Sequence, residues 1–140
     1  FIVNAICYNH ESIFTPQNHV IRKFIDNFEK NDVVKIYNPE EFRNISHIID
    51  FLPLFSKVLD KSKPEDYIFA NNENISIKKI SLIINKFYNK KIIFKSNNKS
   101  ISRMANNLKI KKDFNYCPIF NTEKILIRMV TYHRKNFFLR

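Results

Sequence analysis

The chain has 140 residues, of which 44% are hydrophobic and 14% aromatic, and its formal net charge at pH 7 is +11. This length fits one compact domain, and this hydrophobic content excludes a disordered chain. No apolar run approaches the ~18–20 residues of a membrane-spanning helix, so a membrane protein is not expected. Cys7 and Cys117 stand in no recognisable disulfide or zinc spacing, and we expect a reduced, cytoplasmic protein without a metal site.

The positive charge can be interpreted in two ways. A basic chain attracts polyanions, and aromatic residues alternate with lysines at residues 88–91 and 94–95. However, Lys, Asn, Ile, Phe and Tyr are all abundant and glycine is absent, as an AT-rich coding sequence would produce in any protein. No Lys/Arg run reaches the density of a basic patch. A nucleic-acid or polyanion-binding module therefore stands as the alternative function.

The first half of the chain predicts two strands, a short extended piece and two helices. An apolar, β-rich run at residues 1–7 indicates a strand. A helix is expected at 16–30, because Thr15 and Pro16 suit its N-cap and first turn and apolar residues follow at helical spacing. Residues 33–37 alternate as in a strand, and 42–45 form the short extended piece. A buried helix is expected at 47–61, where Pro53 kinks it or marks its first turn.

The second half continues this alternation. Residues 66–70 predict a strand and 71–74 a turn, after which Ser76 is a suitable N-cap for a helix with apolar residues at 77, 80, 83, 84 and 87. Residues 91–95 predict another strand, 100–108 a short helix, 109–118 an irregular linker and 121–133 a final helix. Alternating strands and helices indicate an α/β fold.

Several segments carry a resemblance to a known family. They are NHES at 9–12, VIRK at 20–23, FRNISHIIDF at 42–51, KPEDYIFA at 63–70 and SRM at 102–104. In this order and spacing they resemble the GDP-mannose 4,6-dehydratases, a branch of the extended short-chain dehydrogenase/reductases and of the NAD-dependent epimerase/dehydratases. The resemblance spans nearly the whole chain and is strongest over the first 80 residues.

The resemblance implies the C-terminal part of such a protein. Residues 1–15 would end a Rossmann-type core, and residues 16–140 would form the small mixed α/β region that binds the nucleotide-sugar. The family converts GDP-mannose to GDP-4-keto-6-deoxymannose by NADP-linked hydride transfer and water elimination. Its Tyr-x-x-x-Lys pair, its Thr and its Glu all precede NHES. We therefore expect this chain to bind GDP-sugar and to be inactive alone.

The resemblance also assigns candidate site residues by position. Asn9, Val20, Lys23 and Arg43 match substrate-binding positions, and His10 matches a position beside the nicotinamide half of NADP. An amide, an ammonium and a guanidinium suit a sugar diphosphate. No catalytic residue is assigned.

Each assignment has a simpler alternative. Asn9 can end its strand in an Asx-type turn, and a helical lysine is usually solvated. Arg43 can form a surface ion pair with Glu40 or Glu41. Both histidines of the motifs, His10 and His47, can be structural.

The chain departs from the family in two respects. IFTP at 13–16 replaces the family's Pro-Arg-Arg-Gly, so two arginines are missing and one of them contacts the cofactor. Because glycine is absent, any turn that needs positive φ must use Asn or a rearranged loop. A separate Rossmann-type chain is a possible partner, since a fragment that opens on a buried strand leaves an unpaired edge.

Overall fold

The computed structural model describes residues 2–61, 64–96 and 101–137. Its strands are β1 (Asn4–Cys7), β2 (His10–Glu11), β3 (Val33–Tyr37), β4 (Phe42–Asn44), β5 (Ser46–His47), β6 (Asp66–Phe69), β7 (Asn74–Ser76) and β8 (Lys91–Lys95). Its helices are α1 (Val20–Lys30), α2 (Ile48–Lys61), α3 (Ile77–Asn85), α4 (Leu108–Phe114) and α5 (Thr122–Phe137). The predicted α/β class is confirmed.

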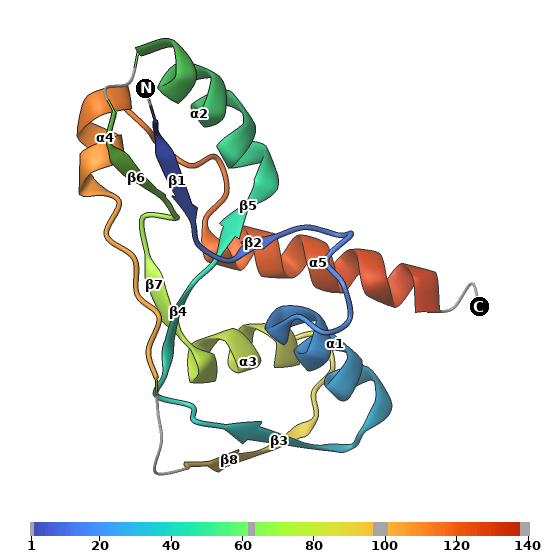
Figure 1. The fold of residues 1–140 in the computed structure, drawn as a ribbon. Coiled ribbons are helices and arrows are strands. Elements are labelled where there is room, and N and C mark those ends of the chain that lie inside the picture. The colour runs from blue at the N-terminus through green and yellow to red at the C-terminus, as the bar shows by residue number, and fades with distance from the viewer. Residues whose placement is uncertain (1, 62–63, 97–100, 138–140) are drawn as a thin grey trace.

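The strands pair two by two. β1 pairs with β6, β2 with β5 and β3 with β8 in parallel, whereas β4 and β7 are antiparallel. Figure 1 shows α2, β1, β6 and α4 at one end of the molecule and α1, α3, β3 and β8 at the other. β4 and β7 run between the two ends.

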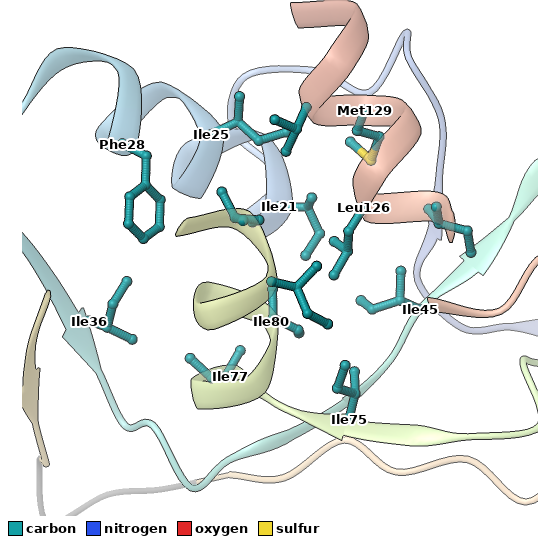
Figure 2. Packing of buried hydrophobic residues seen from close by; sticks show 14 of the residues in the cluster. Ile21, Ile25, Phe28, Ile36, Ile45, Ile75, Ile77, Ile80, Leu126 and Met129 are labelled. Atoms are coloured by element: carbon teal, nitrogen blue, oxygen red, sulfur yellow. The ribbon is translucent and has the colours of Figure 1, made fainter. Parts of the chain in front are cut away.

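Each end has its own hydrophobic core. In the larger core, Ile21 and Ile25 of α1 face Ile80 of α3 and Leu126 and Met129 of α5 (Figure 2). The smaller core gathers aromatic and aliphatic side chains of α2, β6, α4 and the residues just after α4: Phe51, Leu54, Val58, Tyr67, Phe69, Ile110, Phe114 and Tyr116. Burying a large apolar side chain contributes roughly 1.5–3 kcal/mol, so both clusters stabilise the fold.

Two helix starts test the predicted N-caps. Ser76 caps α3 as expected, because its Oγ accepts the amide of Lys79 at 3.2 Å. The predicted start of α1 at Pro16 is wrong, and the helix begins at Val20. The Oγ1 of Thr15 accepts the amide of Ser12 at 2.8 Å instead of capping a helix. The hydroxyl thus closes the preceding loop.

The predicted boundaries between residues 101 and 118 are also wrong. Residues 101–106 form no helix. Within them Arg103 forms a parallel bridge with Arg43, and its amide donates to the Phe42 carbonyl at 2.9 Å. Helix α4 then occupies residues assigned to a linker. The backbone amides of Ile101, Arg103 and Ala105 donate to Glu41, Phe42 and Asn74, so tertiary contacts override the local pattern. Residue 100 lies outside the described residues.

Asparagine meets the turns that usually take glycine. Asn38, Asn89 and Asn115 have φ of 49°, 51° and 51°. Asn tolerates this left-handed region better than most residues, because its short amide can bond to the local backbone. The expectation that Asn would serve where φ is positive is confirmed at these positions.

Buried asparagines also tie β4 to the segments that follow β6 and α4. Asn44 Oδ1 accepts the amide of Asn71 at 2.8 Å. Asn71 Nδ2 donates to the carbonyls of Ile45 and Phe120 at 2.9 and 3.0 Å. Since all these groups are withdrawn from water, each bond also avoids the cost of an unsatisfied polar group.

Replacing Asn71 with Ala should destabilise the protein by about 2–4 kcal/mol, because two largely buried carbonyls lose their donor. Chemical unfolding followed by circular dichroism measures this loss. Asn27→Ala, an exposed position on α1, is the control and should change stability by less than about 0.5 kcal/mol. Equal effects of the two substitutions would contradict a structural role for the Asn71 side chain.

The protein should become less stable to unfolding as the pH falls, because His133, which links α5 to α1, has a lowered pKa in the folded state. Arg22 Nη1 lies 2.8 Å from His133 Nδ1, and burial and then Arg22 lower the His133 pKa from 6.5, against a smaller opposing effect of Asp26. The unfolded chain therefore binds more protons than the folded chain. As the pH falls below about 6.5, protonation of His133 in the unfolded chain lowers the free energy of unfolding. Urea unfolding from about pH 7.5 to about pH 5.5 should show this slope. His133→Gln should flatten this slope, whereas Asn27→Ala, which removes no titratable group, should leave it unchanged.

Candidate functional site

The NHES segment lies directly beside the strand that follows Arg43. The carbonyl of Asn9 accepts the amide of Ser46 at 2.8 Å, and His10 and Glu11 pair with Ser46 and His47. The Asn9 side chain is half-buried. His10 is exposed, with its Nδ1 3.4 Å from the Tyr8 carbonyl. Pairing of β2 with β5 thus brings two predicted site residues close to β4.

Arg43 lies on β4 with its guanidinium held by its own chain. Nη1 donates to the carbonyls of Phe42 and Ile101 at 2.8 and 3.0 Å, and Nη2 donates to Glu41 Oε2. The alternative ion pair is therefore formed, with Glu41 as partner. It is not a surface pair, since the two side chains are only 16% and 9% exposed.

Segment 101–105 brings a second arginine, Arg103, next to β4. It is anchored at three points: the Ser102 hydroxyl accepts the amide of Phe42, the Tyr8 hydroxyl donates to the Met104 carbonyl, and Asn74 exchanges two bonds with Ala105. Tyr8 immediately precedes Asn9. The segment therefore connects β4 with the start of the NHES segment.

Arg103 is the site residue that the sequence did not single out as a ligand. Residues paired across neighbouring strands project to the same face, so the bridge places Arg103 and Arg43 side by side. The Arg103 side chain is exposed and makes no ion pair or hydrogen bond with a residue that the structure describes. SRM at 102–104 was part of the resemblance, and a parallel bridge between distant segments has no local signal that would have identified it.

Val20 and Lys23 stand on a separate element. Both are exposed, Val20 by 40%, on the first turn of α1. The buried side of α1 packs against α3, α5 and β3. The structure thus places Asn9 and His10 beside β5, which follows Arg43 and β4 in the chain, and leaves Val20 and Lys23 on the helix that follows the NHES segment.

Glu11 is a buried carboxyl within this region. It is 3% exposed, its Oε1 lies 3.9 Å from His19 Nδ1, and its Oε2 has no hydrogen-bond partner among the described residues. Burial raises its pKa, while Thr15 and the nearby histidines act against that rise. Its place inside NHES was the signal available in the sequence.

His47 lies in a stack behind the site. Its ring centroid is 4.8 Å from that of Phe120, and the Arg128 guanidinium lies 5.0 Å from the other ring. His47 Nδ1 accepts the amide of Ile49, and burial lowers its pKa, with Asp50 opposing and Arg128 adding to that effect. The imidazole is therefore neutral at pH 7.

Other candidate features lie elsewhere. A hollow of about 640 Å³ between β6 and α4 is lined by Tyr67, Lys109 and their neighbours and holds no predicted site residue. Within residues 2–61, 64–96 and 101–137, no cluster of three His, Cys, Asp or Glu side chains could hold a metal. Over the same ranges no helix has both the length and the apolar character to cross a membrane. The remaining candidate is the bridge between Arg43 and Arg103, because guanidinium groups bind anions well.

Comparison with known structures gives the same fold in sugar-nucleotide enzymes. dTDP-glucose 4,6-dehydratase from Bacillus anthracis, solved with NAD, matches with a TM-score of 0.82, 19% identity, 96% of this chain and 45% of its own. DesIV, the dTDP-glucose 4,6-dehydratase of Streptomyces venezuelae, gives 0.81 and 16% over 98% and 45%. MoeE5, solved with UDP-glucuronic acid and NAD, gives 0.78 and 10% over 96% and 47%. The chain spans less than half of each of these proteins.

Comparison with curated protein sequences gives no match. The model of one protein family, described as GDP-mannose 4,6 dehydratase, matches residues 1–131. This match covers every motif that carried the resemblance. The chain belongs to the GDP-mannose 4,6-dehydratase family.

Proposed function

We propose that this chain forms the nucleotide-sugar-binding part of a 4,6-dehydratase and that its ligand is a GDP-sugar. One observation carries the proposal: a parallel bridge pairs Arg103 with Arg43, and the Asn9 carbonyl accepts the amide of Ser46, three residues after Arg43. Two arginines that project to the same face can present planar donors to the oxygens of a diphosphate. In this assignment residues 1–15 end the Rossmann-type core and residues 16–140 contact the ligand.

Each residue has a role that its chemistry suits. Arg103 and the remaining donors of Arg43 bind the diphosphate. The Asn9 amide both donates to and accepts from sugar hydroxyls. Val20 and Lys23, exposed on α1, contact the nucleotide. The relatives solved with NAD and with UDP-glucuronic acid support a nucleotide-sugar ligand, and the family model supports GDP.

The cofactor of the whole enzyme would be NADP, which takes and returns the hydride. The described residues do not fit a dinucleotide by themselves. His10 is the one contact that the family pattern assigns here, and it is exposed and 3.4 Å from the Tyr8 carbonyl. The family's two arginines are replaced by residues 13–16, which close a loop through Thr15.

We further propose that a Rossmann-type polypeptide docks on β1. All four residues of β1 are exposed, and β6 is its one strand partner within the part of the chain that the structure describes. An exposed apolar strand edge is a template for pairing with another strand. Ile2 and Ile6 are 73% and 45% exposed, and Leu52 and Leu59 on neighbouring α2 are 61% and 73% exposed. A parallel strand added beside β1 would pair with the backbone groups at its free edge.

Only the net charge supports the alternative, a nucleic-acid or polyanion-binding module. The family match over residues 1–131 favours the nucleotide-sugar function. Both proposed roles suit the cytoplasm, where the exposed Cys7 and Cys117 stay reduced.

GDP and GDP-mannose should stabilise the purified chain in a saturable way, measured by thermal shift and calorimetric titration. Arg43→Ala and Lys23→Ala should each weaken binding roughly tenfold, because each removes a charged donor to phosphate. Lys112→Ala, an exposed lysine on α4, is the control and should leave binding unchanged. A cooperatively folded chain that neither ligand stabilises would exclude the proposed function.

A separately expressed Rossmann half of a family member should co-elute with this chain in size-exclusion chromatography. Ile6→Asp should abolish the complex, because it places a charge in the middle of the β1 edge. Leu82→Asp on α3 is matched in exposure, 46% against 45%, and should leave the complex intact. Co-elution of the Ile6 variant at the wild-type level would rule out β1 as the docking edge.

A further inference from the structure

The carboxyl of Glu41 is held in place from three sides. Its Oε1 accepts the Nδ2 of Asn38 at 2.9 Å and the amide of Ile101 at 3.2 Å, and its Oε2 accepts Arg43 Nη2. Glu41 is only 7% exposed. Burial alone would raise its pKa, but the bonds from Arg43, Ile101 and Asn38 outweigh burial and hold the pKa below its ordinary value. The group is therefore an ionised carboxylate at neutral pH.

Arg43 is fixed by the same arrangement. A guanidinium has five N–H donors, and three of them reach Phe42, Ile101 and Glu41 within the chain. Its positive charge lies against a negative charge, and both are shielded from solvent. An anion that approaches Arg43 therefore meets a neutral pair and a nearby carboxylate rather than a free cation.

Arg103 has no such partner among the described residues, and it is exposed. The bridge places it on the same face as Arg43. The two arginines are thus unequal, since one carries its full charge and the other is compensated. The cause of this difference is a single side chain, Glu41.

We propose that Glu41 is a specificity-determining residue of the diphosphate site: by compensating Arg43, it lowers the affinity of the site for highly charged nucleotides. This inference rests on the proposed function. At an effective dielectric of about 40, between the values for bulk water and a protein surface, a carboxylate about 6 Å from a bound phosphate weakens binding roughly tenfold. The effect is largest for free nucleoside diphosphates and smaller for sugar-linked diphosphates, whose terminal phosphate carries less charge.

The test is calorimetric titration of the chain with GDP and with GDP-mannose, comparing the wild type with Glu41→Gln. Gln keeps an oxygen for the bonds from Asn38 and Ile101 and removes the charge. We expect Glu41→Gln to bind GDP roughly tenfold more tightly and GDP-mannose by a smaller factor. Adding Arg43→Ala to it should abolish the gain.

Glu40→Gln is the matched control. It removes the same charge one residue away, from a side chain that is 77% exposed and lies 3.9 Å from Lys78 Nζ. It should change affinity less than twofold, because solvent screens an exposed charge. If Glu41→Gln fails to fold, Glu41→Asp replaces it. The shorter side chain withdraws the carboxylate from Arg43 and should give a smaller gain.

The outcomes separate the inference from the proposed function. Wild-type binding that needs Arg43, together with equal or weaker GDP binding by Glu41→Gln, overturns the inference and leaves the proposed function standing. Absence of both GDP and GDP-mannose binding in wild type and variants alike overturns both. A wild type that binds GDP-mannose, together with GDP binding that appears only when Glu41 is replaced, supports both, because the carboxylate then excludes the more highly charged free nucleotide.

Discussion

The arrangement of this protein depends on the buried amide side chain of Asn44. Its Oδ1 accepts the amide of Asn71, and its Nδ2 donates to the carbonyl of Glu73 at 2.9 Å. Asn71 in turn holds the carbonyls of Ile45 and Phe120. A side-chain amide can satisfy donors and acceptors of three segments at once, which no apolar residue can do. The position of β4, and with it Arg43, follows from these bonds.

The same strand shows how an internal network limits a basic protein. The chain has a net charge of +11, yet the arginine closest to the NHES strand pair is compensated by Glu41. Net charge acts over long range and is screened by salt, whereas a ligand senses the charges within a few ångströms. Local compensation therefore decides what the site binds, and the global excess of lysine does not.

Sequence reasoning recovered elements whose signals are local. The strands at Val33–Tyr37 and Lys91–Lys95 and the cap at Ser76 were predicted at their observed positions. It failed where distant pairing decides. β7, for example, is short and forms only against β4, and segment 101–105 forms no helix because Phe42 and Tyr8 bind its backbone groups.

The candidate site likewise has a part that local motifs predict and a part that depends on contacts between distant segments. Asn9, His10 and Arg43 were identified because each stands in a motif with a fixed spacing, and the β2–β5 pair explains why the motifs lie together. The neighbour of Arg43 across the bridge and its compensation by Glu41 depend on a backbone path of some 60 residues between β4 and segment 101–105. A family motif therefore identifies which side chain faces a ligand, whereas the charge that the ligand meets is set by contacts outside the motif.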